Sequence, residues 1–176
     1  MKATGIVRRI DDLGRVVIPK EIRRTMRIRE GDPLEIYTDA NGEVIFKKYS
    51  PISELSDVAD EYADALVHGT KLSVLICDMD RCVSSAGISK HSTIQKELTH
   101  DLEKIISKRT NYINKGEDLT ALKGLDNKIC AVSPITTSGD LTGAIVLLQN
   151  EKCKTADTSD IPLISVAAKF LGNQMR

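Results

Sequence analysis

Hydrophobic and polar residues alternate in short stretches over the first fifty positions of the chain, and a two-residue period predicts β-strands. Residues 4–10 follow this period, with Ile6 and Ile10 on one face. A β-branched run at residues 16–18 favours a second short strand, which follows a turn at residues 12–14. This part of the chain therefore predicts two strands joined by a turn.

Two further segments, 34–38 and 44–48, alternate in the same way and flank the pair Asn41-Gly42. Asn-Gly between alternating runs is a strong signal for a β-hairpin, because both residues tolerate the positive φ of a tight turn. One face of this hairpin is apolar and needs a cover. A chain of about fifty residues buries only about 60% of its unfolded surface, so it cannot easily supply that cover alone.

Between these strands the pattern changes to that of a short helix, predicted over residues 20–27. Pro19 has a fixed φ near the helical value and is expected at the first helical position. Ile22 and Met26 lie one turn apart and are expected to face inward. The outer side then carries three arginines, Arg23, Arg24 and Arg27. Their guanidinium groups can stay solvated and reach a flat anionic partner.

Positive charge is concentrated at the start of the chain, although the chain as a whole has a net charge of zero. Residues 1–29 hold nine Lys or Arg against three acidic residues, a local net charge of +6. A single Arg-Arg pair is often only a solvated charge run. Contact with phosphate follows the local field, however, so this end of the chain indicates binding of nucleic acid. A single-stranded partner would require stacking aromatic residues, and residues 1–30 contain no Phe, Tyr or Trp.

Four stretches of the first fifty residues are distinctive: 2–9 (KATGIVRR), 13–19 (LGRVVIP), 22–25 (IRRT) and 34–37 (LEIY). Through them, residues 1–49 resemble the N-terminal DNA-binding domain of the AbrB-type transition-state regulators of spore-forming bacteria. The resemblance implies a swapped-hairpin fold, in which two chains interleave their strands into one unit that binds double-stranded DNA. It is also consistent with the need of the hairpin for a cover.

The same resemblance implies which residues contact DNA. They are Arg8, Arg15, Arg23 and Arg24, with Arg9 at a position that is usually also basic. Lys20 departs from the family pattern, in which an apolar residue often follows the proline. Its charge lies beside the expected DNA surface and can alter the choice of target sequence.

A second domain is predicted over residues 51–176, behind a first domain of residues 1–50. Ser50-Pro51 marks the boundary, with Ser50 as a helix cap and Pro51 at the first helical position. Amphipathic segments and apolar runs then alternate along the chain. The predicted helices are 51–68, 93–108 and 161–175, and the predicted strands are 72–78, 82–86, 129–135 and 142–148.

This order of elements predicts an α+β fold, with an antiparallel sheet flanked by helices, and it resembles a GAF domain. Such folds often hold a small ligand between the sheet and its covering loops, so residues 81–92 and 111–126 are the candidate ligand loops. The ligand is unknown, and no individual contact is assigned. The apolar faces of helices 52–67 and 161–175 predict that this domain joins two dimers into a homotetramer.

Several patterns that would indicate other functions are absent from the sequence. No Gly-x-Ser-x-Gly, Gly-x-x-x-x-Gly-Lys or Gly-x-Gly-x-x-Gly motif is present, so no enzyme activity is expected. Four cysteines without a Cys-x-x-Cys pair give no metal site, and no cofactor is expected. The cysteines are expected as reduced, buried residues, with a redox switch as the alternative. The sequence has neither an apolar run of about 18 residues nor a leader, which predicts a cytoplasmic protein.

Two functions fit this organisation. The first is a transcription regulator, an activator or a repressor, which the resemblance implies to act on late sporulation genes. The alternative is an antitoxin that binds a toxin and regulates its own operon, because antitoxins share the swapped-hairpin fold. Antitoxins of that type usually bind the toxin through a disordered, acidic tail, whereas residues 51–176 contain predicted helices and strands throughout. The sequence therefore favours the regulator.

Overall fold

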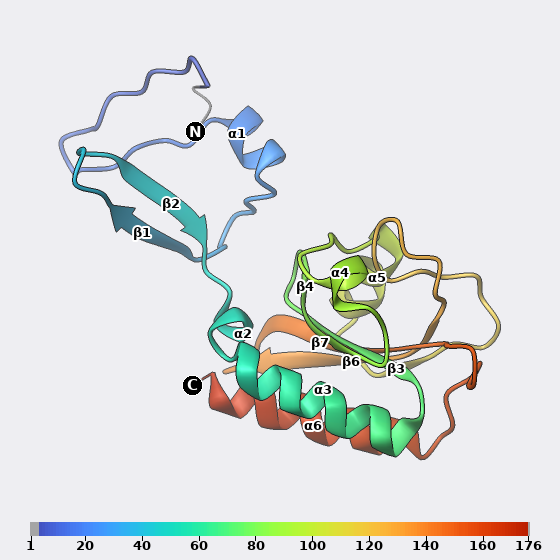
Figure 1. The fold of residues 1–176 in the computed structure, drawn as a ribbon. Coiled ribbons are helices and arrows are strands. Elements are labelled where there is room, and N and C mark those ends of the chain that lie inside the picture. Colours follow the sequence, from blue (N-terminus) through green and yellow to red (C-terminus); the bar gives the residue numbers. More distant parts are fainter. Residues whose placement is uncertain (1–3, 176) are drawn as a thin grey trace. The chain divides into compact units, whose positions relative to one another are not determined.

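The computed structural model describes residues 4–175 and divides into two compact units, Met1–Tyr49 and Ser50–Arg176 (Figure 1). The first unit contains α1 (Lys20–Thr25), β1 (Leu34–Thr38) and β2 (Val44–Lys48). The second contains the remaining helices and strands. None of the helices within residues 4–175 is both long and apolar enough to cross a membrane.

Strands β1 and β2 form an antiparallel hairpin in register from Leu34 opposite Lys48 to Thr38 opposite Val44. The connection is closed by two backbone hydrogen bonds, from Asp39 N to Glu43 O and from Gly42 N to Asp39 O. Gly42 has a φ of +82°, which a side chain would disfavour. The hairpin predicted from Asn41-Gly42 is thus confirmed, with a three-residue loop rather than a two-residue loop.

The strands predicted at residues 4–10 and 16–18 are not formed in the single chain. A strand needs a neighbour for its ladder hydrogen bonds, and β1 and β2 are paired with each other. The helix is also shorter than predicted. It ends at Thr25, Pro19 is its N-cap rather than its first residue, and Met26 is 57% exposed instead of facing inward.

The first unit has almost no interior. Among residues 4–49, Pro19 is the only buried residue. Large apolar side chains lie in solvent instead, with Val7 85%, Ile10 69% and Val17 72% exposed. Burial of apolar surface is the main favourable term in folding, so one copy of this unit lacks the contacts that a stable domain needs.

The second unit is built on a five-stranded antiparallel sheet in the order β4-β3-β7-β6-β5. The strands are β3 (Ser73–Cys77), β4 (Cys82–Ala86), β5 (Tyr112–Ile113), β6 (Ile129–Thr137) and β7 (Asp140–Leu148). All five residues of β3 are buried because this strand lies inside the sheet and both faces are covered. The four predicted strands are confirmed, and β5 is a short addition at the edge.

Helices cover both faces of this sheet (Figure 1). They are α2 (Pro51–Glu54), α3 (Ser56–Thr70), α4 (Lys90–Thr93), α5 (His100–Ser107) and α6 (Asp160–Gln174). On one face, Val74 and Ile76 of β3 pack in a core with residues of α3 and α6. On the other face, Leu75 and Cys77 pack in a second core with residues of α5. The alternation of β3 between two cores fixes its register.

Two predicted helices are interrupted. The helix predicted over residues 51–68 breaks at Leu55, which ends α2 and precedes α3, and it continues to Thr70. The helix predicted over residues 93–108 begins only at His100, where the Thr99 side chain accepts a hydrogen bond from Leu102 N. Residues 94–99 instead form bridges with other segments, as Glu97 does with Arg81. These long-range pairs outweigh the local helical pattern of residues 93–108, which forms a helix only at α5.

A tight turn between β6 and β7, and a glycine in α6, bring β6, β7 and α6 close together. Ser138 and Gly139 both have positive φ, the signature of a type I′ turn, so β6 and β7 join more closely than the predicted loop 137–141. In α6, a Cβ on Gly172 would lie 2.2 Å from the carbonyl oxygen of Thr136. The absence of a side chain at Gly172 therefore lets α6 lie directly against β6.

The phenol of Tyr112 provides a test of the second unit. Burial and the hydrogen bond that Tyr112 donates to Glu117 (2.5 Å) raise the pKa of Tyr112 to about 12. A raised pKa means that the folded state holds this proton more tightly than the unfolded state. The contribution of the protonated Tyr112 to the free energy of unfolding is therefore complete below about pH 10, and it disappears as the pH rises towards 12.

We expect the difference in free energy of unfolding between the wild type and Tyr112→Phe to shrink between pH 10 and pH 12. Denaturant unfolding at several pH values measures it, and other alkaline transitions cancel in the difference. A difference that does not change with pH would contradict the assignment.

Candidate nucleic-acid interface

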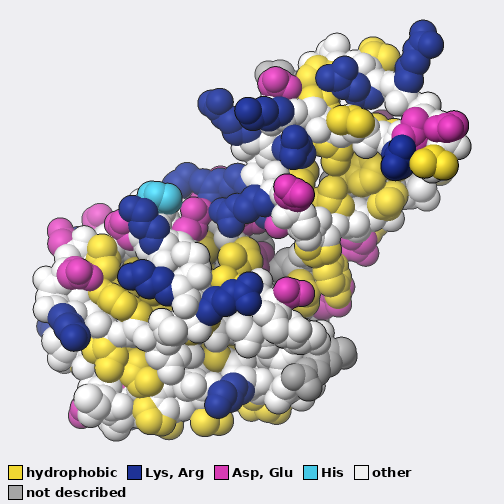
Figure 2. Space-filling model, turned by 180° about the vertical axis from the view of Figure 1, so that it is seen from behind, with side chains coloured by type: hydrophobic (Ala, Val, Ile, Leu, Met, Phe, Trp, Pro, Cys, Tyr) yellow, Lys and Arg dark blue, Asp and Glu magenta, His cyan; other side chains and the backbone are white. Residues whose placement is uncertain are grey.

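Five arginines of the first unit are the predicted DNA contacts, and all five are exposed: Arg8, Arg9, Arg15, Arg23 and Arg24. The first two lie in the extended segment before the turn, Arg15 follows the turn, and the last two lie on α1. Figure 2 shows dark blue Lys and Arg side chains on the N-terminal unit beside yellow hydrophobic side chains at the same surface. That the five form one DNA-binding surface stays a prediction.

A five-residue turn places Arg15. Gly14 N donates to Asp11 O (3.0 Å), Asp11 N donates to Arg15 O (3.1 Å), and Gly14 has a φ of +77°. The Asp11 carboxylate accepts hydrogen bonds from Arg15 N (2.8 Å) and from Arg15 Nε (2.8 Å). These bonds, first the backbone one and then that of the guanidinium, lower the pKa of Asp11. The carboxylate is therefore ionised at neutral pH beside an exposed arginine.

Helix α1 places Arg23 and Arg24 in its last turn. Pro19 precedes the helix with extended ψ, so the chain enters it directly from the segment after Arg15. Arg27 has a φ of +53°, and the reversal is closed by a hydrogen bond from Ile28 N to Arg23 O (2.8 Å). Cations near the C-terminal end of a helix interact favourably with its dipole, so two arginines are accommodated there.

The loop that follows α1 is tied to the hairpin. Lys48 Nζ of β2 lies 3.0 Å from Asp32 Oδ2 and donates a hydrogen bond to Arg27 O (3.1 Å). Asp32 Oδ2 also accepts from Arg29 N (2.8 Å). Lys48 is half-buried, and its charge therefore stabilises the loop through Asp32 and Arg27 O; it is not part of the exposed arginine surface.

The first residues of the second unit are anchored to its sheet. Ser50 is the N-cap of α2 and Pro51 its first residue, as the sequence predicts, but the Ser50 side chain makes no capping hydrogen bond. Its Oγ donates instead to Asp78 Oδ2 (2.9 Å). Asp78 Oδ1 accepts from Asp80 N (2.7 Å) and Arg81 N (2.6 Å), which shapes the β3–β4 turn. Ile52 is buried in the core between the sheet and the helices α3 and α6. Ile52, three residues after Tyr49, is therefore part of the core that α3 and α6 form with the sheet.

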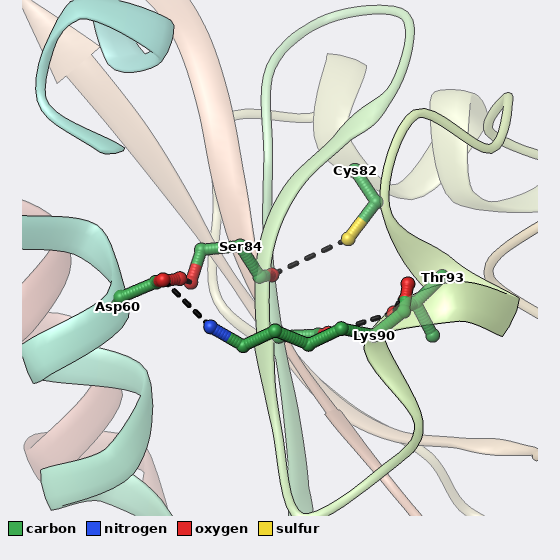
Figure 3. Close-up of polar contacts among 6 residues, drawn as sticks. Asp60, Cys82, Ser84, Lys90 and Thr93 are labelled. Carbon is green, nitrogen blue, oxygen red and sulfur yellow. Dashed lines mark hydrogen bonds and ion pairs between the residues drawn. The ribbon is translucent and has the colours of Figure 1, made fainter. Parts of the chain in front are cut away.

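A charged cluster fixes α3 to the far edge of the sheet (Figure 3). Asp60 of α3 accepts hydrogen bonds from Ser84 of β4 and from Lys90 Nζ of α4, the latter at 2.6 Å. Burial raises the pKa of Asp60, but the hydrogen bonds from Lys90 and Ser84 outweigh it, so the net change is downward. The cluster joins three elements and has a structural role.

The candidate ligand loops lie over a packed layer. Between the sheet and α5, buried side chains such as Leu98, Leu102 and Leu122 fill the core. A polar depression of about 250 Å³ lies at the end of the segment 111–126 and is lined by Asp126, Asn127, Gln149, Asn150, Glu151 and Lys154. Ligand binding in this unit stays a prediction.

All four cysteines are free thiols, and three of them are buried. A hydrogen bond with Cys82 and burial raise the pKa of Cys77 well above its usual value. Burial and the neighbouring Cys153 raise the pKa of Cys130 to about 11. These shifts keep the two thiols protonated and weakly nucleophilic. Among the described residues, no group of three or more His, Cys, Asp or Glu is placed to hold a metal ion.

Comparison with known proteins identifies the second unit first. The model of the family "Stage V sporulation protein T C-terminal, transcription factor" matches residues 54–176. Stage V sporulation protein T of Bacillus subtilis (strain 168) is 49% identical over 178 residues, which cover 99% of each chain. The chain belongs to the stage V sporulation protein T family. It is thus a member of a family of sporulation transcription factors.

The first unit of this family member has relatives of its own. Transition state regulatory protein AbrB of Bacillus subtilis is 63% identical over 51 residues, which are 29% of this chain and 52% of that protein. The model "Antidote-toxin recognition MazE, bacterial antitoxin" matches residues 7–53. The resemblance to AbrB-type regulators is confirmed. The full-length match is to a transcription factor, which does not favour the antitoxin alternative.

The fold of the second unit is also found in a solved structure. The crystal structure of a GAF domain/HD domain protein from Geobacter sulfurreducens matches with a TM-score of 0.53 at 12% identity, and the match covers 69% of this chain and 91% of that chain. Such low identity shows the fold alone. The predicted α+β class with a GAF-like second domain is confirmed.

Sequence reasoning did not single out Asp11, and it did not predict the side-chain partner of Ser50. For Asp11 a signal was present, because the spacing Asp-x-x-Gly occurs at residues 11–14, 39–42 and 140–143, and the first two copies lie between predicted strands. An aspartate at this position can bond to the backbone of the turn that follows it. The partner of Ser50 is Asp78, and no local pattern reveals a contact of that sequence separation.

Proposed function

We propose that the chain regulates transcription by binding double-stranded DNA as an intertwined dimer, through Arg8, Arg9, Arg15, Arg23 and Arg24. The regulated genes are those of late sporulation, and regulation takes place in the cytoplasm, where the DNA lies. The second unit joins two dimers into a homotetramer. The protein acts by binding rather than by catalysis.

The observation that carries this proposal is an exposed basic surface on a unit without a core. Five exposed arginines accompany a local net charge of +6, which favours a polyanion. In the same unit, Pro19 is the only buried residue among positions 4–49, so the apolar surface around these arginines requires a second chain. Interleaved strands would cover that surface and would double the number of arginines on the DNA face.

DNA shape contributes to recognition in this proposal. Helix α1 has six residues and carries its arginines in its last turn, so no long recognition helix is available for the major groove. Arginines on turns and extended segments are suited to phosphates and to narrow grooves. Specificity would then depend on the bending and width of the DNA as well as on base edges.

The apolar surface of α3 and α6 supports the tetramer. Tyr62 of α3 stacks on Phe170 of α6 with ring centroids 4.7 Å apart. Next to this pair on α6, Val166 is 68% and Leu163 44% exposed. A second copy of these helices would bury them. Joining two weak DNA-binding dimers raises overall affinity through effective concentration, provided that both can engage.

Regulation by a small ligand would act through the same interface. A ligand of the second unit can change DNA binding only if it prefers one of two arrangements of the assembly. The ligand proposal therefore depends on the tetramer proposal.

The arginine assignment predicts the dependence of binding on salt. Removal of one arginine that neutralises a phosphate should reduce the log–log slope of affinity against salt by about 0.9. We expect Arg15→Ala and Arg23→Ala to bind duplex DNA more weakly and with shallower slopes, as measured by fluorescence anisotropy from low to moderate salt. Arg109→Ala, at an exposed arginine of the second unit, is the control. Wild-type affinity and slope in both first-unit variants would rule the assignment out.

The dimer proposal predicts that a fragment of residues 1–50 folds only on association. Its melting temperature should rise with protein concentration, because folding and association are one equilibrium. Circular dichroism over a hundredfold range of concentration, with sedimentation at each end, measures this. A folded monomer with a constant melting temperature would refute it.

The tetramer proposal predicts the effect of a charge on α6. We expect Val166→Glu to convert the full-length protein from a tetramer to a dimer in sedimentation velocity and to weaken DNA binding, because a buried unpaired carboxylate opposes the interface. Val166 is exposed in the single chain, so the fold should be kept. Thr155→Glu, which adds the same charge at an exposed loop, is the control. A wild-type protein that sediments as a dimer, with full DNA binding after deletion of residues 51–176, would show that the second unit is passive.

A further inference from the structure

Asp11 is in contact with both the backbone and the side chain of Arg15. Its Oδ1 accepts from Arg15 N (2.8 Å) and from Leu13 N (3.1 Å). Its Oδ2 accepts from Arg15 Nε (2.8 Å). All three bonds lie within one five-residue turn. They are therefore local, and they do not depend on what covers the rest of the unit.

The Asp11 carboxylate both holds the turn and binds the Arg15 guanidinium. A second turn of the same geometry shows that these two roles are separate. Asp39 Oδ1 accepts from Asn41 N (3.0 Å) and Glu43 N (2.9 Å), and Gly42 occupies the place of Gly14 with a φ of +82°. The residue equivalent to Arg15 is Glu43, which cannot donate from its side chain. Asp39 Oδ2 accepts instead from Asn41 Nδ2 (3.2 Å), so the turn forms without an arginine at its fifth position. The bond to Arg15 Nε is an addition.

That added bond sets the direction of the Arg15 guanidinium. Guanidinium is planar and has five N–H donors, of which Nε supplies one. With Nε bonded to Asp11, the edge formed by the two terminal nitrogens remains for a bidentate partner such as a phosphate or a guanine. The Arg15 side chain is 69% exposed, so this edge is accessible to a ligand. An arginine held in one direction loses less rotamer freedom on binding.

The same carboxylate carries a cost for binding. It places a negative charge beside the expected path of the DNA backbone, and this repulsion acts on every DNA sequence alike. The benefit is different, because only a site with an acceptor in the direction of Arg15 gains from the fixed guanidinium. An element that opposes all partners and helps one of them increases discrimination.

We propose that Asp11 is a positioning residue for Arg15 and that it increases the discrimination between specific and non-specific DNA. The inference rests on the proposed function, since it concerns how the same arginine binds DNA. Asp11 would weaken the binding of all DNA through its charge, and it would favour the specific DNA site by holding the Arg15 guanidinium in one direction.

The test compares Asp11→Asn with Asp39→Asn in the full-length protein. An asparagine oxygen still accepts from the backbone, so the turn is kept, but its amide nitrogen cannot accept from Arg15 Nε. Binding is measured to a duplex that the wild-type protein selects from a random library and to a shuffled duplex of equal composition. We expect Asp11→Asn to lower the ratio of the two affinities by about fivefold, the size of one misplaced contact, and Asp39→Asn to keep it.

A second readout excludes a merely structural effect. The salt slope on the shuffled duplex should stay at the wild-type value in Asp11→Asn, because Arg15 still neutralises a phosphate, and should fall by about 0.9 in Arg15→Ala. An unchanged affinity ratio in Asp11→Asn, an equal decrease in both aspartate variants, or a slope in Asp11→Asn that falls as in Arg15→Ala would overturn the inference. Failure of the wild type to bind any duplex would overturn the proposed function itself.

Discussion

The need to bury apolar surface governs the first unit more than any local preference does. Its residues include enough β-branched and apolar side chains for strands, yet Val7, Ile10 and Val17 lie in solvent in the single chain. Backbone hydrogen bonds hold its turns, its helix and its hairpin, but these bonds bury little apolar area. A domain with this balance becomes stable when another chain supplies the missing contacts. Under the proposed function, assembly and DNA binding would then depend on the same surface.

The second unit meets the same constraint within one chain. Its sheet is covered on both faces, and successive residues of β3 alternate between two separate cores. Close approach is made possible at Gly143, where a Cβ would lie 2.1 Å from the carbonyl oxygen of Cys77, and at Gly172. Because Ile52 packs into one of these cores, the stability of the sheet also secures the residues that follow the hairpin. The two units thus differ in where their apolar surface finds a partner.

Patterns that arise from near neighbours in the sequence were predicted well. The hairpin at Asn41-Gly42 depends on alternation and on turn residues, and the strands β3, β4, β6 and β7 depend on short runs suited to strands; the sequence contains both signals. The start of α5 was misplaced because residues 94–99 pair with distant segments, and periodicity carries no information about such pairs. The strands expected at residues 4–10 and 16–18 have no partner strand within the described part of the single chain. The arginines were selected by resemblance, and the role of Asp11 became visible only from its distances to Arg15.

The repeated turn has a consequence for how related regulators can diverge. In both copies an aspartate and a glycine three residues later supply the bonds and the positive φ that the turn requires. In the first copy the bonds that hold the turn join Asp11 to backbone atoms of Leu13, Gly14 and Arg15, so the side chains at positions 12, 13 and 15 can change while the turn is retained. Under the proposed function, mutation at these positions would explore new target sites at little cost in stability. A gene duplicated in one genome could in this way acquire a separate set of promoters by a few substitutions in a single loop.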